Sequence, residues 1–162
     1  MIALAMTVLL AAEPVAKGSG ERLCVLTAAD FRASGIAVNA KPSINLDDGG
    51  KSAYCVYRGK SGATGGVELD VFYPAGESAA DLGNTWKAML ASSPGAKWEP
   101  EGLPGVDDSV YSLAIPQSGY PNYAANGVRR GELIFAISLP AAPGAKDELR
   151  KLSALVLARL AR

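Results

Sequence analysis

The chain has 162 residues, the length of a single domain with a sizeable core. Its 16 Lys and Arg balance its 16 Asp and Glu, so it lacks the basic surface typical of proteins that bind nucleic acid or anionic membranes. It contains no histidine, which excludes Ser-His and Cys-His nucleophile pairs and every imidazole-containing metal site. We expect neither a cofactor nor a metal site.

The N-terminus is apolar and uncharged up to Glu13. A run of about 12 apolar residues is too short to cross a bilayer as a helix, but it suits the apolar region of a secretory signal peptide. We expect residues 1–16 to be a signal peptide, cleaved near residues 12–16, and residues 22–162 to form one domain. A buried N-terminal strand or helix is the alternative. Export predicts a periplasmic or secreted protein without a transmembrane anchor.

Cys24 and Cys55 are the only cysteines. A pair of cysteines in an exported chain is typical of a disulfide. The loop that they would close has about 31 residues, and closing it in the unfolded chain is worth roughly 3.5–4 kcal/mol. We therefore predict a structural disulfide between Cys24 and Cys55.

Helix signals occur at three places in the chain. Thr27 and Ser78 each precede an Asp by three residues, which is a capping box with Asp in place of Glu. The last segment carries Leu149, Leu152, Val156 and Leu160 on one stripe. The predicted helices are 28–34, 79–91 and 145–162.

Alternating apolar and polar residues predict strands between these helices. In the clearest strand Leu69 faces the core, whereas Glu68, Asp70 and Phe72 face away. The predicted strands are 51–58, 67–73, a short 96–99, 109–115, 123–129 and 132–139, with 36–50 irregular. The last two are joined at Arg130-Gly131 or at Asn126-Gly127, and we favour the former. This order predicts an α+β fold, a twisted antiparallel sheet of about five to six strands flanked by two to three helices.

Four local patterns carry a resemblance: Cys24-Val25-Leu26-Thr27, Cys55-x-Tyr57, Gly105-Val106-Asp107-Asp108 and Arg130-Gly131. Over about residues 22–160 the chain resembles small exported bacterial proteins, many of them actinobacterial lipoproteins of largely unknown function. Their architecture is similar to the Mog1/PsbP-like fold, a twisted antiparallel sheet flanked by helices. The resemblance implies an exported, non-enzymatic module and supplies no catalytic residues. This chain departs from the group because no lipid-attachment motif precedes Cys24.

One connection, residues 116–123, combines tyrosines with Ser, Gly and Asn, as binding loops do. The candidate binding residues are Tyr120, Asn122 and Tyr123, with Arg129 and Arg130 nearby for an anionic partner. The alternatives are that the tyrosines pack onto the sheet and that the arginines are solvated turn residues.

Glu68 and Asp70 share a strand face and could supply carboxylates for hydrolysis, although the solvent face of any antiparallel strand has this pattern. We identify no catalytic residue. The sequence predicts an exported binding or accessory module of the cell envelope, a monomer without catalytic activity, acting on an envelope protein or a small ligand. The alternatives are a small exported hydrolase using carboxylates or Ser-Lys chemistry and a structural subunit of an envelope complex.

Overall fold

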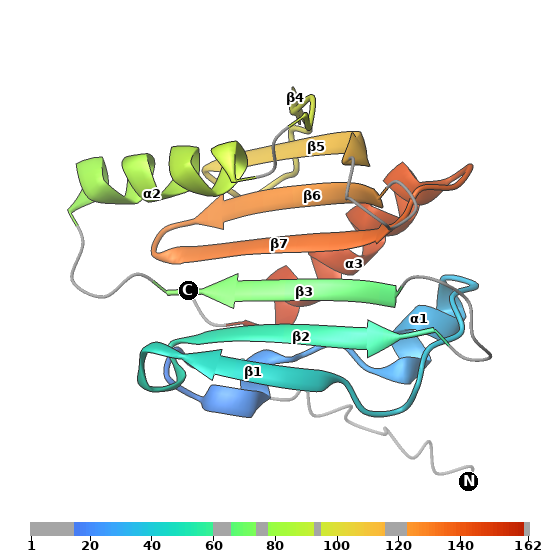
Figure 1. Cartoon of the computed structure of the whole chain (residues 1–162). Helices are drawn as coiled ribbons and strands as arrows, with labels where there is room; N and C mark the ends of the chain where they lie inside the picture. The colour runs from blue at the N-terminus through green and yellow to red at the C-terminus, as the bar shows by residue number, and fades with distance from the viewer. Residues whose placement is uncertain (1–14, 60–65, 74–77, 93–94, 116–122, 161–162) are drawn as a thin grey trace, which may run out of the picture.

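The strands of the computed structural model form one open antiparallel sheet (Figure 1). The structure describes residues 15–59, 66–73, 78–92, 95–115 and 123–160. Within these ranges the strands are β1 (Ser43–Asp47), β2 (Ser52–Arg58), β3 (Gly66–Phe72), β4 (Glu99–Pro100), β5 (Asp108–Ile115), β6 (Tyr123–Arg130) and β7 (Leu133–Pro140). Their order across the sheet is β1-β2-β3-β7-β6-β5-β4. Two meanders therefore meet where β3 pairs with β7.

Helices cover both faces of the sheet (Figure 1). The α-helices are α1 (Ala28–Ala33), α2 (Ala79–Ala91) and α3 (Ala145–Arg159), and the short 3-10 turns are η1 (Gly20–Leu23) and η2 (Asp48–Gly50). Both predicted capping boxes are confirmed, Thr27 with Asp30 at α1 and Ser78 with Asp81 at α2. The α+β fold class is therefore confirmed.

The main core lies between the sheet and α3. Leu69 of β3, Phe135 and Ile137 of β7, and Leu149 and Leu152 of α3 are at most 1% exposed. All belong to one cluster that also includes Phe31 of α1. The opposite face of the sheet carries α2.

The predicted strand count of five to six is wrong, because the sheet has seven strands among the described residues. The additional strand is β1, which lies in the segment 36–50 that we expected to be irregular. β1 is an edge strand and most of its residues are exposed, so burial imposes little alternation on its sequence. The glycines that follow it, at 49 and 50, mark the turn into β2.

Two local expectations also need correction. The turn between β6 and β7 consists of Gly131 and Glu132, one residue later than expected, because Arg130 pairs with Leu133. Gly131 has a φ of 58°, which favours glycine. In β5 a bulge between Ser112 and Ile115 interrupts the predicted alternation, and Leu113 is 54% exposed.

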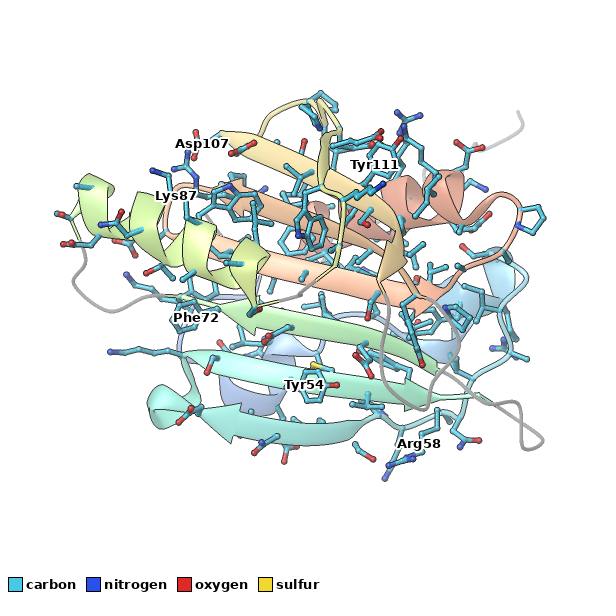
Figure 2. All side chains as sticks on the ribbon, turned by 45° about the horizontal axis from the view of Figure 1, so that its top comes forward. Tyr54, Arg58, Phe72, Lys87, Asp107 and Tyr111 are labelled. Atoms are coloured by element: carbon cyan, nitrogen blue, oxygen red, sulfur yellow. A yellow bond between two sulfur atoms is a disulfide. The ribbon has the colours of Figure 1, made fainter. Side chains whose placement is uncertain are left out.

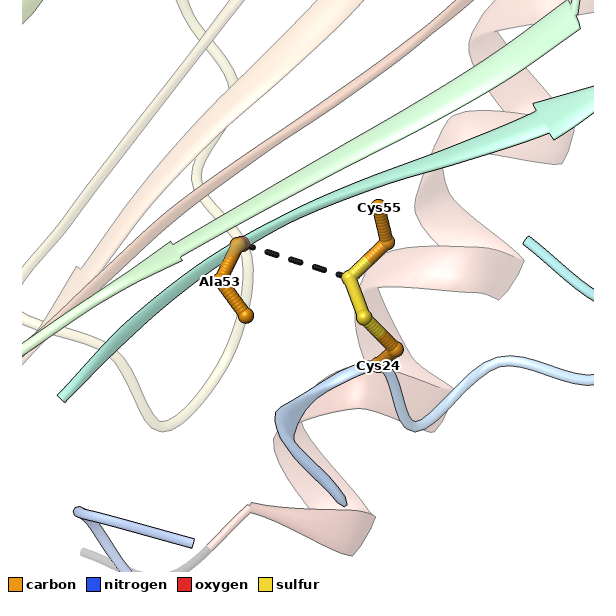
Figure 3. The surroundings of a disulfide bond; sticks show 3 residues. All are labelled: Cys24, Ala53 and Cys55. Carbon is orange, nitrogen blue, oxygen red and sulfur yellow. Dashed lines mark hydrogen bonds between the residues drawn. A yellow bond between two sulfur atoms is a disulfide. The ribbon is translucent and has the colours of Figure 1, made fainter. Parts of the chain in front are cut away.

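The predicted disulfide is present. Cys24 follows η1, Cys55 lies in β2, and their Cα atoms are 5.8 Å apart (Figure 3). Cys55 is completely buried, and its Sγ approaches the carbonyl oxygen of Ala53 at 4.0 Å. Because an oxidised sulfur has no hydrogen to donate, we interpret this approach as a van der Waals contact. The crosslink fastens the N-terminal segment to the core face of the sheet.

No helix within the described ranges is both long enough and apolar enough to span a membrane.

Candidate functional site

The three predicted binding residues that the structure describes, Tyr123, Arg129 and Arg130, do not form one surface. Tyr120 and Asn122 lie outside the described residues. Tyr123 is 3% exposed and packs against Trp98, while Arg129 is half-buried. The Arg130 guanidinium donates hydrogen bonds to the carbonyls of Leu157 (2.8 Å) and Leu160 (2.7 Å), so it holds the end of α3. Because residues 123 and 130 differ in parity along β6, their side chains lie on opposite faces of the sheet.

A groove lies instead between α2 and the β1–β3 half of the sheet, on the face opposite α3. It encloses about 420 Å³. Its walls include Asn45 and Asp47 of β1, Tyr54 of β2, Asp70 and Phe72 of β3, and Thr85, Ala88 and Met89 of α2. Figure 2 shows Tyr54 and Phe72 on this face, in the part of the sheet that α2 leaves uncovered.

The groove exists because α2 covers only the other half of the sheet. α2 packs closely against β6 at Gly127, because this residue has no side chain. A Cβ there would lie 3.1 Å from both Trp86 and Met89. The indole of Trp98 donates to the carbonyl of Leu90 at 3.0 Å, which holds the C-terminal end of α2. One side of the helix therefore becomes a wall beside the exposed strands.

The polar groups of the groove come from paired strand positions. Tyr54 and Asp70 are direct Cα partners across β2 and β3, and Glu68 lies two residues from Asp70 on the same face. That spacing separates the two backbone positions by roughly 6.5–7 Å. Ser138 of β7 donates to the Glu68 carboxylate at 3.4 Å. A phenol and two carboxylates thus share one small area.

The two carboxylates give this area a negative electrostatic potential. Desolvation and the neighbouring Glu68 carboxylate raise the pKa of Tyr54 to about 12. The same two causes, desolvation first, raise the pKa of the Asp70 carboxyl above its ordinary value. No Lys or Arg is among the described residues that line the groove. A second carboxylate therefore raises the electrostatic cost of charging Asp70, and no lysine or arginine of the groove wall offsets it.

The carboxylates of the groove do not form a metal centre. Within the described ranges, no group of three or more His, Cys, Asp or Glu side chains is placed to hold a metal ion. The arrangement suits hydrogen bonding and charge pairing with an organic ligand.

A second hollow, of about 500 Å³, lies near the start of α3 and is lined mainly by apolar residues, among them Ile36, Val38 and Leu139. Gly59 and Gly66 border it, and the residues that connect them lie outside the described ranges. We therefore assign no function to this hollow.

The strand alternation correctly placed Glu68, Asp70 and Phe72 on one face, but it identified that face only as ordinary solvent-exposed sheet. The missed signal is Phe72, a large apolar side chain on an otherwise polar face. Its partners across the strands are Ser52 on β2 and Ile134 on β7, and its ring is only half-buried between them. Comparison of the chain with protein-family models, curated proteins and solved structures finds no match.

Proposed function

We propose that the chain is an exported binding module that holds a small ligand in the groove between α2 and β1–β3 and performs no bond chemistry. The observation that carries this proposal is the composition of the groove. Tyr54, Phe72 and Met89 supply apolar area, and Asp70 and Asn45 supply a few polar groups. Small-molecule sites typically have this mixture in a volume of roughly 300–1,000 Å³.

The proposed location is the periplasm or the extracellular space. The Cys24–Cys55 disulfide supports it, because disulfides persist in those oxidising compartments and are rare in the cytosol. The groove lies on the opposite face of the sheet from this crosslink, so ligand binding does not require the covalent anchor to move.

Filling the groove tests the proposal. Ala88 is exposed and lines the groove, so Ala88→Trp should place an indole in the space that a ligand needs. We expect compounds found by an NMR screen of small aromatic molecules to shift groove resonances in the wild type and not in Ala88→Trp. Ala154→Trp, at an exposed position of α3, is the matched control and should bind as the wild type does. Equal binding by both variants would contradict the groove assignment.

One observation favours a second function, carboxylate-based hydrolysis. Asp70 has a raised pKa beside a second carboxylate, which is how general acids are prepared in glycosidases. Chromogenic glycosides distinguish the two functions. Turnover by the wild type that is lost in both Asp70→Asn and Glu68→Gln would establish the hydrolase, whereas groove binding without turnover supports the binding module.

A further inference from the structure

We propose that the groove selects an organic cation, an ammonium or guanidinium group carried on an apolar body. This inference rests on the proposed binding function and adds the charge and shape of the ligand. Three independent properties of the groove support it: the sign of its charge, the aromatic side chains beside that charge, and its size.

The charge of the groove has one sign. Asp70 lines it and Glu68 adjoins Asp70, whereas none of its described wall residues is a lysine or arginine. Figure 2 shows Lys87 of α2 on the side of that helix away from Phe72, and Arg58 at the other end of β2. A cation is therefore the ligand charge that complements this surface.

Asp70 is the carboxylate best placed to receive that cation. Glu68 already accepts a hydrogen bond from Ser138, and Tyr54 also bonds to it. At Asp70, by contrast, no hydrogen bond or ion pair is observed within the described parts of the chain. A charged donor arriving beside Tyr54 would give Asp70 a partner that the described part of the fold does not provide.

The aromatic side chains of the groove provide a second interaction that also favours a cation. Tyr54 is 39% exposed and Phe72 is half-buried, and both lie on the groove face. The face of an aromatic ring attracts an ammonium or guanidinium group and also packs against hydrocarbon. A ligand with both a cationic and an apolar part would use the carboxylate and the rings together.

The size of the groove distinguishes an organic cation from an inorganic one. A volume of about 420 Å³ is far larger than a metal site needs, and no metal-holding cluster exists among the described residues. Small-molecule ligands occupy volumes of this order. Met89 and Ala88 on the α2 wall provide apolar contact for the body of such a ligand.

Three probes that share a phenyl body and differ in charge test the inference: phenethylammonium, 2-phenylethanol and 3-phenylpropionate. Dissociation constants are measured by NMR titration of the wild type, Asp70→Asn, Tyr54→Leu and the control Asp147→Asn. Asp147 is an exposed carboxylate on α3, outside the groove. Thermal unfolding of each variant verifies that it is folded.

We expect phenethylammonium to shift the groove resonances and to bind more tightly than the other two probes. Asp70→Asn and Tyr54→Leu should each weaken its binding roughly five- to tenfold, and Asp147→Asn should leave it unchanged. Asp70→Asn should not weaken 2-phenylethanol. Raising the salt concentration should weaken only the charged probe.

Two results would overturn the inference, and they differ in what they say about the binding function. If 2-phenylethanol or 3-phenylpropionate binds in the groove as tightly as phenethylammonium, the preference for a cation is wrong and groove binding stands. If no probe shifts groove resonances, the cation inference is also wrong, and the Ala88→Trp screen with chemically broader compounds decides the binding function separately.

Discussion

Arg159 of α3 and Asp30 of α1 are joined by two parallel hydrogen bonds, although they are 129 positions apart in the sequence. The guanidinium Nη1 donates to Oδ2 at 2.6 Å, and Nη2 donates to Oδ1 at 2.8 Å. Nη1 also donates to the carbonyl of Val25. Because Asp30 accepts from the backbone of Thr27 as well, one carboxylate connects the start of α1 to the end of α3.

This pair should make the protein sensitive to acid. The hydrogen bonds from Arg159 are the main reason that the pKa of Asp30 is lowered from 3.8 to about 2 in the folded chain. A carboxyl with a depressed folded-state pKa stabilises the fold above its unfolded-state pKa and loses that contribution as the pH falls through the folded-state value. We expect a loss on the order of 1–2 kcal/mol in the free energy of unfolding, since Arg159 is about one-third exposed.

Urea unfolding at neutral pH and at several acidic pH values measures this loss. Asp30→Asn should be less stable than the wild type at neutral pH and should show a shallower decline on acidification. An Asp30→Asn variant with the same acid slope as the wild type would assign that slope to other carboxyls.

Removing the disulfide should destabilise the protein substantially. Cys24 and Cys55 close a loop of 31 residues, and the entropy of such a loop in the unfolded chain corresponds to roughly 3.5–4 kcal/mol. Cys24→Ala with Cys55→Ala should lower the urea midpoint accordingly. The unreduced, denatured wild type should contain no free thiol in a thiol titration, and two free thiols would refute the crosslink.

Truncating a side chain should cost far more stability on the buried face of β3 than on its groove face. Leu69 is completely buried and Phe135 of β7 is 1% exposed, so Leu69→Ala and Phe135→Ala should each cost roughly 2–5 kcal/mol of unfolding free energy. Glu68 faces the groove and is only half-buried, so Glu68→Ala should change it by no more than about 0.5 kcal/mol. Urea midpoints in the reverse order would contradict the assignment of the faces.

Replacing glycine by alanine should have opposite effects on stability at Gly83 and at Gly66. Gly83 lies inside α2 with no atom within 4 Å of a Cβ, so Gly83→Ala should stabilise the protein by roughly 0.5–1 kcal/mol. At Gly66 a Cβ would lie 2.4 Å from the carbonyl oxygen of Tyr57, which is backbone and cannot rotate away. Gly66→Ala should therefore lower the melting temperature while Gly83→Ala raises it. If the melting temperature rose in both variants, β2 and β3 would have to move apart easily near Gly66.

The sequence predicts best those features that depend on residues close together in the chain. The capping boxes at Thr27 and Ser78 require only a side chain and a backbone amide three residues away, so their helices were predicted within one residue at each end. Asn126-Gly127 shows the limit of local reasoning. This pair is typical of a tight turn, but it lies inside β6. Asn126 donates to Ser153 of α3 on one face, and Gly127 makes room for α2 on the other.

The groove could not be predicted for the same reason. Tyr54, Asp70 and Phe72 lie on a face that sequence periodicity predicts, but a groove forms only when α2 lies across the neighbouring strands. That placement depends on Gly127 and Trp98, which are distant in sequence from β2 and β3. Tertiary packing, which the alternation pattern does not encode, turns a polar strand face into a concave site.

The order of the elements along the chain has a consequence for biosynthesis. α3 follows every strand, so the ribosome releases the complete sheet before the helix that covers its core face. Until α3 emerges, Leu69 and Phe135 lack the opposing layer of the core, and Val15 lacks its bridge partner Leu160. The core face of the sheet therefore cannot be fully buried until the last helix of the chain has been synthesised. Arg159, near the end of α3, is also what joins this last helix to Asp30 and to the carbonyl of Val25, so the N-terminal segment gains these contacts only at the same stage.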